Sequence, residues 1–218
     1  TSEGAVFRNV RERVGAAPVP PTPPIVVGVD LAKHRDFTVF SAFDARGHMV
    51  AFERMQLLPY PAQAERLCSF IRQWNAGTCV IESNGPGEPF HDMVSERLWD
   101  ERRQGLMQCQ LIPFATTSTS KSQMINALVI AFEKSEVTIL DDPVLANEFE
   151  AYEMKPSIAI NERFGAPEGM HDDCVMACAL AWTEVGLGLR SGDRQQPATV
   201  RPERDRDKSF WTAKGTDW

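Results

Sequence analysis

The chain has 218 residues, of which 43% are hydrophobic, and its formal net charge is −7. A chain of this length can bury a sizeable core, so the sequence predicts one domain with loose ends. No apolar run approaches the roughly 20 residues of a membrane-spanning helix, and the charged first residues do not fit a signal peptide. These features argue against a membrane protein and predict an intracellular one.

Cysteine usage and charge distribution narrow the class further. The five cysteines lie in apolar stretches without a CxxC pair, so reduced thiols are expected instead of disulfides or a zinc site. The negative charge is concentrated in the middle of the chain, since the residues before 25 and after 188 are basic on balance. An acidic domain repels nucleic-acid phosphates unless it holds positive ions, and a divalent metal would meet that need.

Composition divides the chain into three parts. Residues 1–24 end in the proline-rich stretch GAAPVPPTPP and are predicted to be an N-terminal segment and linker. Residues 25–188 are the predicted domain. Residues 189–218 are polar, with alternating charge signs, and are predicted to be a flexible tail or to dock on a partner.

Hydrophobic periodicity predicts three strands followed by strands and helices in alternation. The predicted strands are residues 25–31, 36–43, 48–57, 78–82 and 109–113, with a short one just before 141–143. The predicted helices are residues 61–75, 89–99, 120–134, one starting near 143, and 173–187, which is apolar nearly all round and therefore buried. A two-stranded ribbon is expected at 151–162, bent at Lys155. This order indicates an α/β fold with a mixed central sheet flanked by helices.

The first strand ends in an aspartate, Asp30, that shares one face with Val26 and Gly28. Because both faces of this strand are apolar, an ionised carboxylate there is costly unless it is paired or binds a metal. The alternative is a strand-end Asx turn with the residues that follow.

Two further apolar elements also present carboxylates at one end. Glu82 ends the strand 78–82, and since glutamate is not a turn former, its alternative is a salt bridge to a nearby arginine. The glycine-rich turn behind it lacks the GxxxxGK[ST] spacing of a phosphate-binding loop. Asp172 and Asp173 precede the last helix and are explained equally by an N-cap and a first-turn acid. One residue suffices as a cap, however, so if Asp172 caps the helix, Asp173 is free to face a metal.

Three apolar elements that each end in a carboxylate are what a hard cation requires. Mg²⁺ and Mn²⁺ take oxygen ligands and share their remaining positions with waters and substrate phosphates. The four histidines have neither HxxxH nor HExxH spacing, which disfavours a zinc hydrolase.

Four segments, in this order along the chain, carry a family resemblance: GVDLAKHRDFTVF, CVIESNGPG, TSTSKSQMINALV and APEGMHDDCVMACALAW. Together they resemble the nuclease domain of the large terminase subunits of tailed bacteriophages, in the ribonuclease-H-like (RuvC-like) nuclease superfamily. The resemblance runs from about Ile25 to Leu187, and SEGAVFRNVRERV is similar to the segment that joins the family's ATPase domain to its nuclease domain. No ATPase motif precedes residue 25, so an isolated nuclease domain or a piece of a longer subunit is expected.

The resemblance implies a ribonuclease-H-like fold, an accessory hairpin near the active site, and roles for individual residues. Asp30, Glu82 and Asp173 would be the catalytic metal ligands, where the family often has aspartate in place of Glu82. The same resemblance makes Asp36 and Asp172 further acids of the metal site. Lys121 and Lys155 would contact DNA, although for Lys121 a solvated lysine in the first turn of its helix is the alternative.

The activity that the resemblance implies is endonucleolytic cleavage of double-stranded DNA during viral genome packaging. Asp30 would be shared between two Mg²⁺ or Mn²⁺ ions, one activating the attacking water and the other stabilising the departing 3′ oxygen. The expected partners are double-stranded DNA, the ATPase domain of the same subunit, the small terminase subunit and the portal protein. The expected location is the cytoplasm of the infected bacterial host.

Three rival functions remain open on the sequence. A junction resolvase or transposase-type nuclease would show the same acids. An actin-like or sugar-kinase ATPase also has a strand ending in GxD, but it needs small residues and hydroxyls where this chain has Lys33-His34-Arg35. A non-catalytic DNA-docking module, whose acids only cap and pair, predicts no stabilisation by Mn²⁺.

Overall fold

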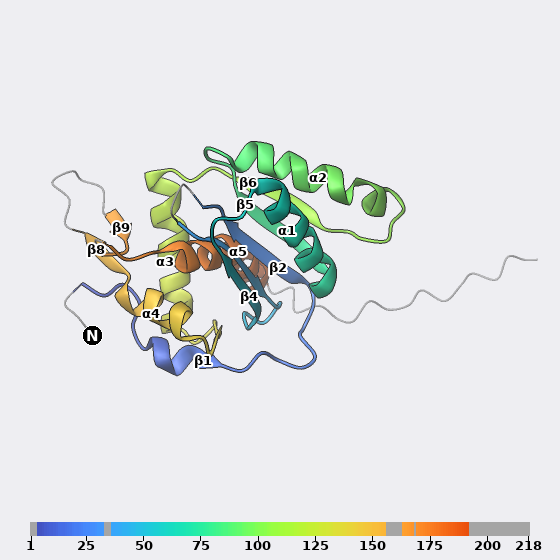
Figure 1. The fold of residues 1–218 in the computed structure, drawn as a ribbon. Helices are drawn as coiled ribbons and strands as arrows, with labels where there is room; N and C mark the ends of the chain where they lie inside the picture. Colours follow the sequence, from blue (N-terminus) through green and yellow to red (C-terminus); the bar gives the residue numbers. More distant parts are fainter. Residues whose placement is uncertain (1–3, 33–35, 156–162, 168, 192–218) are drawn as a thin grey trace, which may run out of the picture.

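The computed structural model describes residues 4–32, 36–155, 163–167 and 169–191. Its centre is a five-stranded sheet in the order β4-β3-β2-β5-β6 (Figure 1). The strands are β2 (Ile25–Asp30), β3 (Thr38–Phe43), β4 (Met49–Met55), β5 (Ala76–Glu82) and β6 (Gln110–Phe114). Since β2 pairs antiparallel with β3 and parallel with β5, the sheet is mixed, and the predicted fold class is confirmed.

Helices cover both faces of this sheet (Figure 1). Val27 and Val29 of β2 share a core with α1 (Tyr60–Trp74) and α2 (Gly87–Arg103). Val26 faces the opposite core, which contains side chains of three helices: α3 (Ser118–Glu133), α4 (Pro143–Ala151) and α5 (Asp173–Ser191). The period-two alternation read from the sequence therefore holds along β2. Within the described residues, no helix combines the length and the apolar character needed to cross a membrane.

The helix α5 lies directly on the face of β2 that carries Asp30. A Cβ atom added at Gly28 would stand 2.1 Å from the carbonyl oxygen of Ala177 and 2.5 Å from the amide nitrogen of Ala181. Only glycine permits such a close approach between a strand and a helix backbone. The predicted burial of this helix is confirmed, and the close packing fixes its N-terminal end relative to the end of β2.

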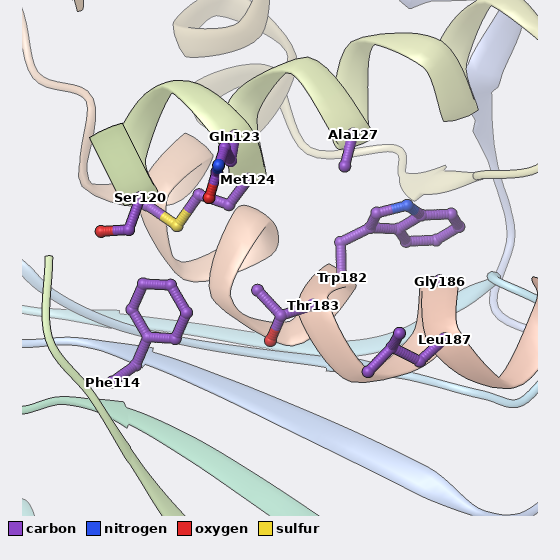
Figure 2. Close-up of a pocket in the computed structure, with 9 residues that line it drawn as sticks. All are labelled: Phe114, Ser120, Gln123, Met124, Ala127, Trp182, Thr183, Gly186 and Leu187. Atoms are coloured by element: carbon purple, nitrogen blue, oxygen red, sulfur yellow. The ribbon is translucent and has the colours of Figure 1, made fainter. Parts of the chain in front are cut away.

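A cavity of about 190 Å³ lies between α3 and α5, beside the end of β6. Figure 2 shows Trp182 projecting from α5 toward α3, with Phe114 of β6 and Met124 of α3 at the other end of the cavity. The Trp182 ring also meets Phe43 of β3 edge-on, with the ring centroids 6.0 Å apart. This cavity is a packing feature of the helical layer.

The segment before Ile25 contributes to the core, whereas the sequence alone predicts a linker there. Phe7 is buried against Phe132, Phe149 and Tyr152. A short 3-10 helix, Val10–Arg13, leads into β1 (Val14–Gly15), which pairs in parallel with β7 (Ile139–Leu140). The isolated apolar side chains in this charged stretch give no periodic signal, yet burying one phenylalanine is worth about 1.5–3 kcal/mol.

The two-stranded ribbon exists, and its first strand lies within 151–162 as expected, whereas its second strand begins just after that range. Residues up to Ala151 complete α4, and the ribbon pairs β8 (Glu153–Lys155) with β9 (Arg163–Gly165) in antiparallel register. The other edge of β8 is occupied by the N-terminal segment, since the amide of Met154 donates to the carbonyl of Gly4. The predicted bend begins at Lys155, the last residue of β8, and its remainder lies outside the described residues. The predicted tail was 189–218, but residues 189–191 complete α5, and 192–218 lie outside the described residues.

Candidate active site

A cleft of about 360 Å³ opens where β2 and β5 end. Five carboxylates line it, and they are the five acids singled out from the sequence: Asp30, Asp36, Glu82, Asp172 and Asp173. Among the described residues that line the cleft, Lys121 is the only one with a cationic side chain. The structure therefore gathers acids from four separated parts of the chain around one strongly negative space.

Asp30 and Glu82 are neighbours because β2 and β5 are adjacent parallel strands whose carboxyl ends meet at one edge of the sheet. Their exposed fractions are only 8% and 4%. Burial raises the pKa of Asp30 well above its ordinary value, the negative charges of Glu82, Asp173 and Asp172 raise it further, and a hydrogen bond to Glu82 adds to the effect. A cation bound in this space would favour the charged form of the Asp30 carboxyl group.

The alternative of an Asx turn at Asp30 does not hold. That turn would use the amide of Ala32, which donates instead to Thr38 Oγ1 at 2.9 Å. Thr38 Oγ1 in turn donates to Gln63 Oε1 at 2.7 Å, and Tyr60 donates to the carbonyl of Ala32 at 3.1 Å. These contacts anchor the start of the loop between β2 and β3, which carries Asp36, so the Asp30 carboxylate has no turn to form.

Asp173 begins α5 and enters the cleft from the opposite side. Its Oδ2 accepts a hydrogen bond from the amide of Phe37 at 3.1 Å and lies 3.5 Å from His171 Nδ1. Burial raises the pKa of Asp173 to about 6 against the hydrogen bond from Phe37, and the charges of Glu148 and Asp36 raise it while His171 lowers it. This carboxyl group therefore titrates much closer to neutral pH than an exposed aspartate.

The N-terminus of α5 is held by a residue that sequence patterns did not indicate. Glu148 of α4 is buried, and its Oε2 accepts a hydrogen bond from the amide of Cys174 at 2.9 Å. The side chain of Asp172, by contrast, forms an ion pair with Lys121 at 3.1 Å. The sequence suggested that Asp172 caps the helix and thereby leaves Asp173 free to face a metal; here the side chain of Glu148 binds the first turn instead, and Asp172 pairs with Lys121.

A histidine completes a second group of donors at the mouth of the cleft. One ligand atom each from Asp36, His171 and Asp173 lie within 4.8 Å of one another. His171 belongs to no metal-binding motif of fixed spacing, so sequence patterns did not indicate it. Its position directly before the Asp172-Asp173 pair is the signal that could have identified it. Its ring also packs edge-on against Phe37, with the centroids 5.1 Å apart.

The two lysines assigned to DNA contacts have different outcomes. Lys121 lies in the first turn of α3, as expected, but it is ion-paired with Asp172 inside the cleft and is not simply solvated. Lys155 ends β8, opposite Arg163 in the register, and its side chain lies outside what the structure describes. Contact with DNA stays a prediction for both.

The donor set suits a hard divalent cation. The neighbouring negative charges raise the pKa of Asp30, so a bound cation would relieve their repulsion, and a group of carboxylate oxygens matches Mg²⁺ or Mn²⁺ better than a thiolate-seeking metal. The five cysteines are all buried and free, away from this cleft lining.

The raised pKa of Asp173 predicts how stability depends on pH without metal. Between the ordinary value near 4 and the folded value of about 6, the native state holds a proton that the unfolded state has released, so stability falls as pH rises through this range. Thermal unfolding in EDTA at pH 4 to 7.5 should show the fall, and it should be shallower for the Asp173→Asn variant. An equal slope for variant and wild type would contradict the assignment.

Comparison with known proteins places this geometry in a family. The family model of the terminase RNaseH-like domain matches residues 27–184. The large terminase subunit of Thermus virus P23-45 is 29% identical over 179 residues, which are 82% of this chain and 35% of that protein. The chain thus spans about a third of the length of this relative.

Solved structures agree with the family model. The large terminase nuclease from the thermophilic phage G20c superposes with a TM-score of 0.70 at 22% identity, covering 84% of this chain and 99% of that one. The same nuclease with bound magnesium gives a TM-score of 0.67 at 25% identity, again covering 84% and 99% of the two chains. The chain therefore belongs to the terminase RNaseH-like domain family and has the ribonuclease-H-like fold of phage large terminase nuclease domains.

Proposed function

We propose that this domain is a metal-dependent endonuclease that cleaves double-stranded DNA by two-metal phosphodiester hydrolysis, as the nuclease part of a viral genome-packaging terminase. The observation that carries the proposal is the meeting of three buried carboxylates, Asp30, Glu82 and Asp173, in one cleft of a chain from the terminase nuclease family. A DNA-docking module would have no physical reason to bury three acids side by side.

In this proposal Asp30, Glu82 and Asp173 are the catalytic metal ligands. Asp30 interacts electrostatically with both other acids, which makes it the carboxylate best placed to be shared between two ions. When bound, the ions would supply an activated water and stabilise the departing 3′ oxygen. Structures of the G20c nuclease hold magnesium, cobalt or zinc, which supports a divalent site in this fold.

The remaining cleft residues position the ligands and the substrate. Asp36 and Asp172 also line the cleft, where their carboxylates could accept hydrogen bonds from water molecules bound to a cation. Lys121 holds Asp172 and is the cationic side chain among the described residues that line the cleft, while Lys155 sits on the ribbon beside α3. We assign both lysines to the DNA backbone.

The partners follow from the same proposal. They are double-stranded DNA, the ATPase domain of the same subunit, the small terminase subunit and the portal protein, all acting in the cytoplasm of the infected host. The relatives matched over 35% of their length leave room for such an ATPase domain in the full subunit.

Digestion of supercoiled plasmid with Mg²⁺, with Mn²⁺ or with EDTA tests this function. We expect nicked and linear products with either ion and none with EDTA. A parallel digestion of a four-way junction and a linear duplex distinguishes the proposed nuclease from a junction resolvase, since a resolvase would cut the junction and spare the linear duplex. Absence of cleavage with both ions would contradict the proposal.

A further inference from the structure

Two separate contacts that hold Asp173 converge on one buried acid, Glu148 of α4. Glu148 is 6% exposed, and its Oε2 accepts a hydrogen bond from the amide of Cys174 at 2.9 Å. Cys174 follows Asp173 directly, so this bond fixes the first turn of α5 and with it the backbone of Asp173.

The second contact starts from the other oxygen of the same carboxylate. Glu148 Oε1 lies 3.4 Å from Arg54 Nη2 of β4. The guanidinium carbon of Arg54 stands 3.2 Å from the centre of the Phe37 ring, a cation–π arrangement. The amide of Phe37 then donates to Asp173 Oδ2 at 3.1 Å, so the path from Glu148 closes on the carboxylate of Asp173.

This circuit joins four parts of the chain: α4, the end of β4, the loop before β3 and the start of α5. A buried glutamate of this kind is costly, and an apolar side chain would pack α4 against α5 without that cost. Metal ligands, in contrast, need partners that fix their orientation, and loss of such partners typically lowers metal affinity or activity 10- to 100-fold. The position of the circuit, around one cleft carboxylate, fits this second purpose.

We propose that Glu148 and Arg54 are positioning residues that together orient the Asp173 carboxylate for divalent-cation binding. The inference rests on the proposed function, since it assumes that Asp173 is a ligand. Neither residue lines the cleft, so neither touches the substrate.

Titration of metal-free protein with Mn²⁺ alone, without DNA, tests the inference through a dissociation constant. Glu148→Gln keeps an oxygen for the Cys174 amide but loses the charge that holds Arg54, and Arg54→Lys keeps the charge but loses the planar group over Phe37. We expect each to raise the Mn²⁺ dissociation constant and to lower the cleavage rate about 10-fold. In the double variant the Mn²⁺ dissociation constant should rise by less than the product of the two single increases, because Glu148 and Arg54 contact each other and act on the same carboxylate.

Matched controls come from surface ion pairs on the same elements. Glu150 of α4 pairs with Arg11 at 2.7 Å, and Arg66 of α1 pairs with Glu53 of β4 at 2.6 Å. The side chains to be varied, Glu150 and Arg66, are 40% and 58% exposed, against 7% and 20% for Glu148 and Arg54. Glu150→Gln and Arg66→Lys should leave the Mn²⁺ dissociation constant unchanged. Melting temperatures in EDTA, recorded for every variant, separate a loss of stability from a loss of metal affinity.

The outcomes distinguish this inference from the proposed function. Wild-type Mn²⁺ affinity in folded Glu148→Gln and Arg54→Lys variants, while Asp173→Asn loses binding, would overturn the inference and leave the nuclease proposal in place. A wild-type protein that binds no Mn²⁺ would overturn both.

Discussion

Asp30→Asn is expected to abolish metal-dependent cleavage while the fold persists. The amide keeps the size and a hydrogen-bond donor toward Glu82, but it removes the negative charge at the centre of the acid cluster. Loss of a residue that orients a metal ligand typically lowers activity 10- to 100-fold, so loss of a ligand itself should lower the cleavage rate by well over about 100-fold. Plasmid cleavage with Mn²⁺ measures the effect, and the melting temperature in EDTA should equal or exceed that of the wild type, because a strained buried acid has gone.

Asp92→Asn is the matched control for this experiment. The Asp92 side chain is 75% exposed on α2, which packs on the sheet face opposite α5, and Asp92 does not line the cleft, so its loss should change neither cleavage nor stability. Cleavage at a wild-type rate by the Asp30→Asn variant would remove Asp30 from the site.

Gly28→Ala is expected to destabilise the domain strongly. The new Cβ atom would meet the backbone of α5 at Ala177 and Ala181, and a backbone cannot rotate aside as a side chain can. Overpacking costs about 1–3 kcal/mol and occasionally more, and a clash with backbone atoms should lie near the upper end of that range. Because Gly28 lies two residues before Asp30, pushing α5 away from β2 should also separate Asp173 from Asp30 and lower cleavage.

Urea unfolding of the Gly28→Ala variant beside Gly188→Ala measures this cost. Gly188 lies in α5 with nothing within 4 Å of an added Cβ, so alanine there should be neutral or stabilise by up to about 1 kcal/mol. A Gly28→Ala variant as stable as the wild type would mean that α5 does not pack this closely on β2.

The sheet and its helices could be predicted from the sequence because their signals are local. The continuous apolar run of β2 indicates a strand buried on both faces, and the apolar circumference of α5 indicates a buried helix. Boundaries were less accurate, since α2 runs to Arg103 and α5 to Ser191, beyond the apolar residues that define their periods. Polar last turns continue a helix without adding to its hydrophobic pattern.

Some residues of the site could be predicted from local sequence, and others only from the folded structure. The cleft acids stand at the ends of apolar elements, where a carboxylate is conspicuous, and the topology brings them together. Glu148 lies within an ordinary amphipathic helix and Arg54 in an edge strand. Only the folded arrangement shows that Glu148 binds the first turn of α5 and that Arg54 contacts both Glu148 and the Phe37 ring. The Phe37 contact with Asp173 uses a backbone amide, which every residue except proline has, so the sequence cannot indicate it.

Crystals grown with Mn²⁺ and measured at the manganese absorption edge locate the ions directly. The account predicts anomalous density in the cleft, with oxygens of Asp30, Glu82 and Asp173 at coordination distances of about 2.0–2.5 Å. Density that lies only elsewhere on the domain, or none at saturating Mn²⁺, would contradict it.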